Sequence, residues 1–351
     1  MNPFWLTADE LALYDAVGDR DRQTGFLSMS AWMIVTRPSI TDPGWMSVLD
    51  NKWDFAARIR ESGVPTPGTL GLLHPIGGRS AQGRRLRDAT DLEDWARHEG
   101  SDGFVLKPVD GMGSRGVVLV HGVHMDGSRV RFLVGEGERT ADELLELQRR
   151  AWRTQGSILE ERCLPDPAVL RLGFTPADTV RVLTGIDALG APEIISARLF
   201  GARSAVLEDR WTNGGLSVGI DLETGCFGQA RTRPHAEPGS FGVHPDSGVR
   251  FEGEPLPGWE AMARMARLAA EAFAMHPFVV WEFLPSERGP VLIEGNRNFG
   301  VQVMQAGGDG FLRGPFRQIL DRLGADVPDG SRGWAVRHSR PMRVLKGLRA
   351  R

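Results

Sequence analysis

The feature that most constrains the fold is the stretch from Phe278 to Gly300, FVVWEFLPSERGPVLIEGNRNFG. Two short runs rich in Val, Phe, Trp and Ile flank a cluster of Pro, Ser, Gly and Arg, which predicts an antiparallel hairpin with a long loop. With a seven-residue loop from Pro285 to Val291, Glu282 faces Glu294, and Asn296 points to the same side. The predicted hairpin therefore brings two carboxylates and an amide oxygen to one face.

Opposing carboxylates of this kind call for a cation. Like charges directly opposite each other destabilise a sheet, so a buried pair of Glu282 and Glu294 needs a positive charge between its oxygens. Hard oxygen ligands suit Mg²⁺, which prefers a few carboxylates together with substrate phosphates. The sequence thus indicates Glu282, Glu294 and Asn296 as candidate Mg²⁺ ligands. The alternative is a solvent-facing hairpin whose acids do not meet.

Length and composition exclude several classes of protein. At 351 residues, with 41% hydrophobic and 25% charged residues and a net charge of −3, the chain is typical of a soluble globular protein of two or three lobes, without a bias toward nucleic acid or membrane. Cys163 and Cys226 lack CxxC spacing, which argues against a zinc site or a disulfide framework and favours the cytoplasm. The sequence has no secretory signal and no apolar stretch of about 18 residues, so no membrane span is expected.

Lysine is rare in this chain. Of 42 basic residues, only Lys52, Lys107 and Lys346 are lysines. Keeping lysine at two interior positions, while arginine is used almost everywhere else, indicates a need for a compact ammonium group there. For Lys52, at the start of a predicted helix, the alternative is a solvated surface side chain.

A glycine-rich turn follows the predicted strand 104–109, which carries Lys107. Residues 111–116, GMGSRG, have the GxGxxG spacing and precede a second predicted strand, 117–121. A dinucleotide-binding fold requires a helix after these glycines, and a protein kinase requires a lysine on the strand after them, which this chain lacks. A lysine on the strand before the turn can instead hold phosphates while backbone N–H groups close over them. The alternative is a plain glycine-rich hairpin.

Two further regions carry polar residues next to apolar ones. The apolar run 157–164, SILEERCL, includes two adjacent acids and is a candidate hinge between the lobes, with Asp166 as a nearby acid. Residues 179–186 and 192–200 are predicted to be paired strands from which Arg181 and Arg198 point. Arginines in apolar strands are costly to bury unless anions meet them.

The order of these motifs resembles the ATP-grasp superfamily over roughly Leu49 to Ile319. In that family, a lysine in a D-(x)-K segment and a strand lysine before a glycine-rich loop contact ATP phosphates. Asp50-Asn51-Lys52 and Lys107 match these motifs. The hinge acids that border adenine are matched by Glu160 and Glu161, and the ligands of two Mg²⁺ ions by Glu282, Glu294 and Asn296.

Other segments point to particular branches of the superfamily. Asp178 to Arg181, then Ala197-Arg198, then Asn213-Gly214-Gly215, are similar to the glutamate-ligase-like branch. The stretches 243–248 and 256–259 look most like the sugar-transfer-associated group. The chain departs from the pattern where Glu282 replaces the more usual aspartate and where residues 297–300, RNFG, replace a Ser-Pro-Gly turn. The N-terminal domain is also shorter than in many members.

The resemblance implies an α+β ATP-grasp fold in which two α/β lobes clamp ATP, preceded by a short N-terminal helical segment. The expected division is an N-terminal helical segment 1–48, an N-lobe 49–160 with the glycine-rich loop, a C-lobe 161–325 with the metal and substrate site, and a basic C-terminal tail 326–351.

The implied activity is an ATP- and Mg²⁺-dependent carboxylate–amine ligase that forms an amide through an acyl phosphate. Its expected substrates are a small-molecule carboxylate and an amine, with no membrane or nucleic-acid partner. The implied catalytic residues are Arg181, Arg198 and Asn213, and the implied nucleotide contacts are Lys52, Lys107, Gly111, Gly113, Ser114, Gly116, Glu160, Glu161, Cys163 and Asp166. The alternatives are a phosphotransferase on the same fold and a non-catalytic nucleotide-binding module.

Overall fold

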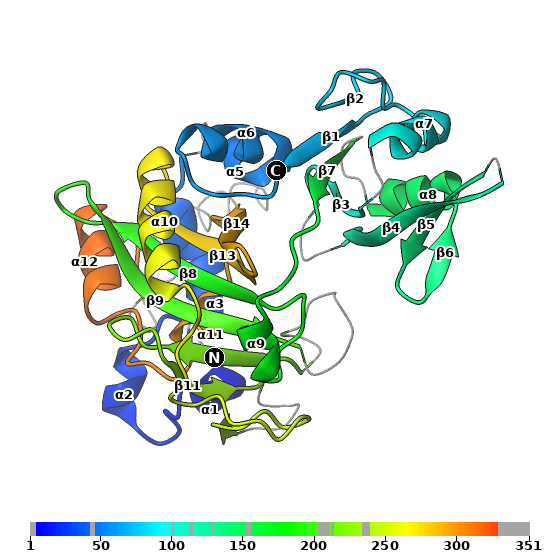
Figure 1. The fold of residues 1–351 in the computed structure, drawn as a ribbon. Helices are drawn as coiled ribbons and strands as arrows, with labels where there is room; N and C mark the ends of the chain where they lie inside the picture. Colours follow the sequence, from blue (N-terminus) through cyan, green and yellow to red (C-terminus); the bar gives the residue numbers. More distant parts are fainter. Residues whose placement is uncertain are drawn as a thin grey trace, which may run out of the picture.

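The described part of the chain forms two antiparallel sheets with helices on their faces (Figure 1). The computed structural model describes residues 5–42, 46–99, 102–111, 115–127, 129–151, 156–202, 211, 214–233 and 239–328. The expected mixed α/β architecture with short N-terminal helices is confirmed. Most of the predicted C-terminal tail lies outside the described residues.

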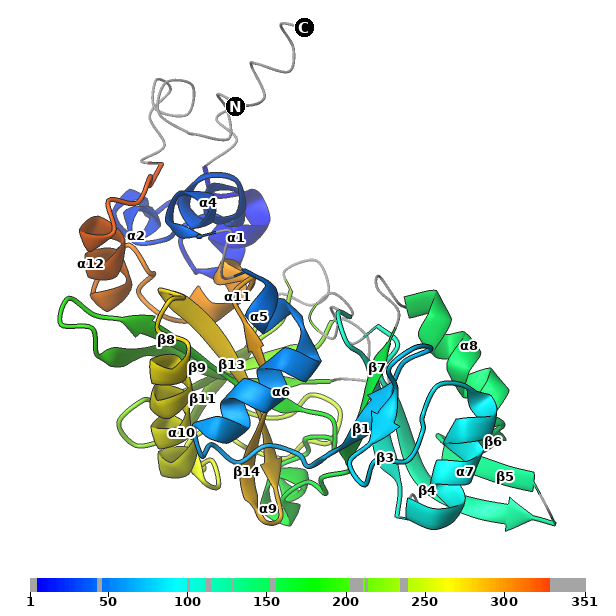
Figure 2. The same cartoon turned by 90° about the horizontal axis from the view of Figure 1, so that it is seen from above.

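The strands described in the N-lobe form one sheet in the order β2-β1-β7-β3-β4-β5-β6. The strands are β1 (Thr69–Leu73), β2 (Arg79–Ser80), β3 (Phe104–Pro108), β4 (Val118–Asp126), β5 (Arg129–Val134), β6 (Gly137–Arg139) and β7 (Ser157–Glu161). Helices α7 (Ala89–Glu99) and α8 (Ala141–Ala151) cover the face turned away from the C-lobe, as Figure 2 shows. The side chains of β3 alternate between the two faces of this sheet. Phe104 and Leu106 are buried against the helices, whereas Lys107 points to the other face.

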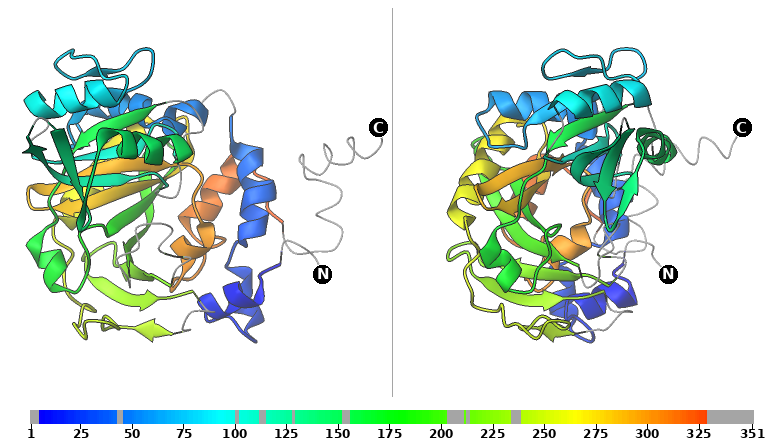
Figure 3. Two further views of the ribbon diagram at one scale, coloured as in Figure 1. Left: turned by 90° about the vertical axis from the view of Figure 1, so that its right-hand side faces the viewer. Right: turned by 45° about the vertical axis from the view of Figure 1, so that its right-hand side comes forward.

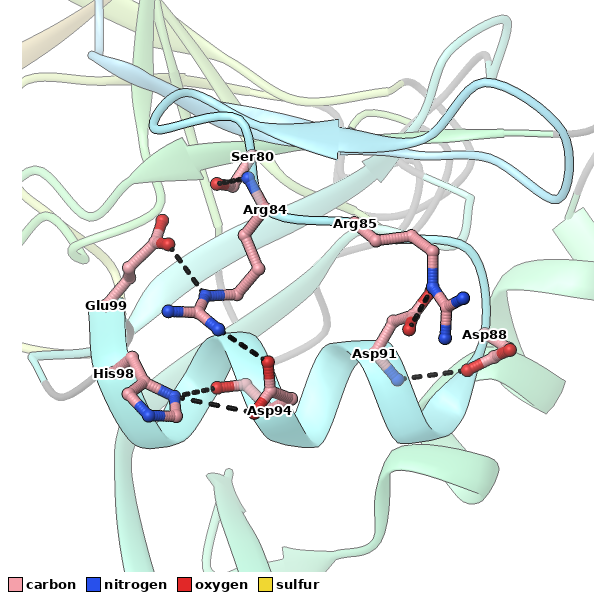
Figure 4. Close-up of polar contacts among 8 residues, drawn as sticks. All are labelled: Ser80, Arg84, Arg85, Asp88, Asp91, Asp94, His98 and Glu99. Atoms are coloured by element: carbon pink, nitrogen blue, oxygen red, sulfur yellow. Dashed lines mark hydrogen bonds and ion pairs between the residues drawn. The ribbon is translucent and has the colours of Figure 1, made fainter.

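A polar network fastens the loop after β2 onto helix α7 (Figure 4). Arg84 donates to Asp94 at 2.7 Å and to Glu99 at 3.1 Å. Arg85 contacts Asp91 at 2.8 Å, and Asp91 is itself buried. These contacts involve the outer side of the lobe, so they stabilise the loop without contributing to the inner face.

Among the residues that the structure describes, the strands of the C-lobe sheet follow the order β12-β11-β10-β9-β8-β13-β14. The strands are β8 (Thr179–Ile186), β9 (Pro192–Gly201), β10 (Leu216–Ile220), β11 (Phe227–Arg231), β12 (Ser240–Phe241), β13 (Phe278–Ser286) and β14 (Gly289–Asn296). Short helix α9 (Pro167–Arg171) follows the connection from the N-lobe.

The two faces of the C-lobe sheet differ. Helix α10 (Trp259–Ala272) packs on one face, where Val180, Val182 and Trp281 join the core. The residues between them in sequence, among them Arg181 and Glu282, point to the opposite face. Alternation along the strands therefore separates an apolar layer under α10 from a face that carries the charged side chains.

Helices at both ends of the chain cover part of that second face. They are α1 (Ala8–Leu13), α2 (Arg20–Thr24), α3 (Met29–Ala31), the π-helix η1 (Trp32–Thr36), α4 (Arg37–Ile40), α11 (Val301–Gln305) and α12 (Pro315–Arg322). Trp32 is buried against Phe278, Phe299 and Phe316. Figure 3 shows the N-terminal helices beside α11 and α12.

Helices α5 (Met46–Asp50) and α6 (Lys52–Glu61) pack against the C-lobe, although the boundary expected at residue 49 assigns α6 to the N-lobe. Leu49, Phe55 and Ile59 belong to the apolar core under α10, so these helices lie on the C-lobe although they precede the N-lobe strands. Lys52 thereby starts from the C-lobe and faces the space between the lobes.

Candidate active site

A cavity of about 340 Å³ lies between the two sheets. Residues of both lobes line it, and among them are Lys52, Lys107, Glu160, Arg181, Glu282 and Glu294. A volume in this range suits a small-molecule ligand. The space between the lobes therefore gathers most of the charged residues that the sequence indicated.

The terminal hairpin pairs Glu282 with Glu294 as predicted, but the predicted long loop is wrong, because β13 continues to Ser286 and β14 begins at Gly289. Glu282 pairs with Glu294 across β13 and β14, and a register shift follows Glu282. Asn296 Nδ2 donates to Glu282 Oε1 at 3.0 Å, and Arg181 Nη2 lies 2.9 Å from the same oxygen. The two carboxylates and the amide thus lie on one face, as expected, and Arg181 approaches them from β8.

Lys52 joins the two lobes. The side chain of Asn51 caps helix α6 by accepting from the N–H groups of Trp53 and Asp54, and this places Lys52 at the first position of the helix. The Lys52 N–H donates to Val109 O at 2.8 Å, and its Nζ donates to Gly111 O at 2.6 Å. The same Nζ lies 3.3 Å from Glu294 Oε1.

Lys107 and Glu160 form a buried ion pair on adjacent strands of the N-lobe. Their Nζ and Oε2 atoms lie 2.6 Å apart, and their side chains are 13% and 7% exposed. Burial alone lowers the pKa of Lys107, but the carboxylates of Glu160 and Glu294 outweigh it, and the pKa is raised. Lys107 therefore carries its charge throughout the neutral range.

The hinge segment supplies part of the wall. Glu160, Glu161 and Cys163 line the cavity, together with apolar side chains of both lobes. Glu161 Oε2 accepts from the Gly68 N–H at 3.3 Å, and a side chain at Gly68 would overlap this carboxylate. Burial raises the pKa of the Cys163 thiol.

Two expected residues lie elsewhere. The Asp166 carboxylate accepts from the Ala168 N–H at 2.7 Å and caps α9, and Asp166 does not line the cavity. The sequence predicts a catalytic role for Arg198. Arg198 pairs directly with Arg181 in the register of β8 and β9, but its Nε donates to Ser217 Oγ at 2.6 Å and its Nη1 to Ala306 O, so the guanidinium lines a different hollow.

The glycine-rich turn is described only in part. Gly111 and Arg115 line the cavity, whereas Gly116 has φ +73°, accepts from Gln148 Nε2 at 2.6 Å and is not among the lining residues. Gly113, Ser114 and Asn213 lie outside the described residues.

Sequence reasoning missed several cavity residues. Arg115, Phe200 and Trp211 line the cavity, and the Arg181 guanidinium lies 4.2 Å from the centre of the Phe200 ring. The strand pattern could have indicated Phe200, because it lies two residues after Arg198 on the same face. The apolar residues of the cavity carry no such signal.

The residues present fit a Mg²⁺ ion. Glu282, Glu294 and Asn296 offer oxygen donors on one face of a hairpin, and hard oxygen ligands are those that Mg²⁺ prefers. Within the described residues, no group of three or more His, Cys, Asp and Glu side chains is placed to hold a metal ion. The candidate set consists of two carboxylates and one amide, and Mg²⁺ on such a set would keep coordination positions for substrate oxygens.

A comparison of sequences with protein-family models decides the family. The model described as "Sugar-transfer associated ATP-grasp" matches residues 38–319. The chain belongs to the sugar-transfer-associated ATP-grasp family. This confirms the resemblance drawn from the motifs, and no curated protein sequence matches this ATP-grasp chain.

Solved structures with a similar fold are distant in sequence. Biotin carboxylase from Campylobacter jejuni, in complex with a β,γ-ATP ligand, has 14% identity and a TM-score of 0.48 over 81% of this chain and 48% of that chain. The biotin carboxylase domain of 2-oxoglutarate carboxylase from Hydrogenobacter thermophilus, with MgADP and bicarbonate, has 14% identity and a TM-score of 0.45 over 84% and 48%. L-amino acid ligase from Bacillus licheniformis has 15% identity and a TM-score of 0.40 over 73% and 42%. The ATP-grasp chain thus spans about half the length of these three proteins.

Among its described helices, none has the length and apolar character that crossing a membrane requires.

Proposed function

We propose that this ATP-grasp protein is an ATP-dependent ligase that joins a carboxylate to an amine through an acyl phosphate. The observation that carries the proposal is that Lys52 and Lys107 line the same cavity as the paired acids Glu282 and Glu294, with Lys52 Nζ 3.3 Å from Glu294 Oε1. Two ammonium groups beside paired carboxylates suit a triphosphate with its metal ion better than an uncharged ligand.

The lysines and the acids have separate roles in this proposal. Lys52 and Lys107 hold phosphate oxygens, because both ammonium groups are positioned by protein contacts before any ligand arrives. Glu282, Glu294 and Asn296 hold Mg²⁺, which when bound neutralises phosphate charge and orients the transferred group. Apolar side chains such as Val105, Leu119 and Leu284, next to the hinge, provide the surface for a planar base.

Arg181 is the proposed catalytic cation. Its guanidinium contacts Glu282 at 2.9 Å, lies 4.2 Å from the centre of the Phe200 ring, and lines the cavity. A substrate carboxylate oxygen attacks the γ-phosphorus while the bond to the departing ADP breaks, and Arg181 stabilises the charge on the transferred group. An amine then attacks the acyl carbon, and inorganic phosphate leaves as the amine gives up a proton.

Hydroxylamine provides a test that does not require the natural amine. A panel of carboxylic acids is incubated with the protein, MgATP and hydroxylamine, and ADP, free phosphate and hydroxamate are measured. We expect equal amounts of all three with an acid that is a substrate, and loss of all three in Lys107→Met. The control is Arg317→Met, which removes a surface ion pair with Asp321.

The same assay separates the alternatives. ADP formed with a phosphorylated acceptor, and without free phosphate, would identify a phosphotransferase. Bound ATP that is never converted to ADP with any acid would identify a binding module.

A further inference from the structure

A second hollow, of about 500 Å³, lies beside the candidate active site on the C-lobe sheet. Strands β9, β10 and β11 contribute to it, together with the segment 304–311 that includes the end of α11. Arg181 lines the first cavity, and Arg198, its direct partner in the register of β8 and β9, lines the second. Directly paired residues point to the same face, so the two spaces are neighbours on one sheet face.

Arg198 is a buried positive charge in the wall of this hollow. It is 5% exposed, and its hydrogen bonds go to neutral oxygens: the hydroxyl and carbonyl of Ser217 and the carbonyl of Ala306. Within the described residues it forms no ion pair with an acid, and burial together with Arg231 lowers its pKa to about 9, which leaves it charged at neutral pH. A buried charge without a counter-charge is costly, and an anionic ligand would offset that cost.

The other charged side chains of the hollow are already satisfied. Arg231 contacts Asp15, Arg313 contacts Asp21, Asp309 lies 3.7 Å from Arg22, and Asp221 accepts hydrogen bonds within its own turn. Arg198 is therefore the charge in this wall that an incoming anion would neutralise.

The glycines of the hollow keep the space before the guanidinium groups open. Arginine has five N–H donors, and the three hydrogen bonds of Arg198 leave two for a ligand. Gly219 pairs directly with Arg198, and a Cβ at this position would lie 3.6 Å from Arg198 Nη1. A Cβ at Gly307 would lie 3.8 Å from Arg231 Nε. Both values are ordinary contact distances, so side chains there would fill the hollow without displacing the backbone.

We propose that this hollow binds a second anionic group, a carboxylate or a phosphate, of the acid substrate, while the reacting carboxylate of the same molecule extends past Phe200 to Arg181. The inference rests on the proposed function and narrows the substrate class to acids that carry two negative groups. Arg198 then selects the substrate and does not take part in phosphoryl transfer, which differs from the role expected from the sequence.

The test compares succinate and inorganic phosphate with butyrate, which has the length of succinate but one charge less. Each is titrated into the protein saturated with MgADP at constant ionic strength, and the shift in Tm gives the affinity. We expect succinate or phosphate to stabilise the protein and butyrate to have no comparable effect. Gly219→Ala weakens that affinity at least about tenfold, whereas Gly122→Ala, a strand glycine of the N-lobe whose Cβ would also meet only an ordinary contact, leaves it unchanged.

Either of two results would overturn the inference: no stabilisation of the natural sequence by succinate or phosphate, or equal affinity in Gly219→Ala. Arg198→Met is a second variant, and it must lose the anion effect if it folds. The titration is repeated without nucleotide, and the anion affinities of the natural sequence and Gly219→Ala are compared again. Failure of MgADP to bind would contradict the proposed function, whereas failure of the anion effect alone would contradict only this inference.

Discussion

Lys52 Nζ lies 3.3 Å from Glu294 Oε1, and this contact ties the helix that precedes the N-lobe to the last strand of the C-lobe. The same ammonium group donates to Gly111 O at the start of the glycine-rich turn. Lys52 therefore contacts both lobes. Replacing it, and measuring both stability and ATP affinity, distinguishes a structural role from a role in ligand binding.

We expect Lys52→Met to weaken ATP binding by at least about tenfold while changing the free energy of unfolding by about 1 kcal/mol or less. The ion pair is partly exposed, so its contribution to stability is small, whereas a phosphate would lose a positioned charge. Isothermal titration calorimetry and urea unfolding measure the two effects. Unchanged ATP affinity, with Arg317→Met as the control, would contradict the assignment.

The buried pair of Lys107 and Glu160 behaves differently. Removing one partner leaves an uncompensated buried charge, so Lys107→Met should cost about 3 kcal/mol of stability. The double variant Lys107→Met/Glu160→Leu should recover most of that loss but not the affinity for ATP. If the double variant binds ATP normally, Lys107 serves only the fold.

His276 makes stability depend on pH. Burial, with Arg297 nearby, lowers the pKa of His276 below its ordinary value of about 6.5. The unfolded chain then binds the proton more tightly, so the stability given by the neutral imidazole is present above about pH 6.5 and is lost as the pH falls toward the lowered pKa. We expect His276→Gln to lose less stability than the natural sequence between about pH 7 and about pH 5 in urea unfolding. An identical loss in both proteins would rule out His276 as the source.

Cys163 provides a chemical probe of the cavity. Burial raises the pKa of its thiol, so little thiolate is present at neutral pH and alkylation by iodoacetamide should be slower than that of free cysteine. Because Cys163 lines the cavity and Cys226 does not, MgATP should slow the labelling of Cys163 alone. Mass spectrometry of the labelled peptides distinguishes the two thiols. If MgATP protects both thiols equally, or protects neither, the nucleotide does not bind in this cavity.

The hairpin and its register followed from the sequence because strand alternation is a local property. Val280, Glu282 and Phe283 belong to a run whose pattern fixes which side chains face each other. The short turn between Ser286 and Gly289 was not foreseen, and neither was the bulge after Glu282, which together with that turn keeps Glu282 opposite Glu294. The packing of α6 on the C-lobe was not predictable in this way, since an amphipathic helix does not specify which sheet it covers.

Arg198 and Asp166 illustrate two kinds of error. Arg198 shares a face with Arg181, as the strand pattern implies, but the segment at Ala306 that binds its guanidinium is distant in sequence. Asp166 precedes Pro167 at the start of a short helix, and this Asp-Pro pair is a local capping signal that could have been recognised.

The most direct test of the account is the magnesium dependence of ATP binding, measured by calorimetry with and without Mg²⁺ for the natural sequence, Glu282→Gln and Glu294→Gln. We expect Mg²⁺ to strengthen ATP binding to the natural sequence at least about tenfold, and both variants to lose that gain. ATP affinity that is independent of Mg²⁺ in the natural sequence, or a full magnesium effect in both variants, would contradict the assignment of these acids.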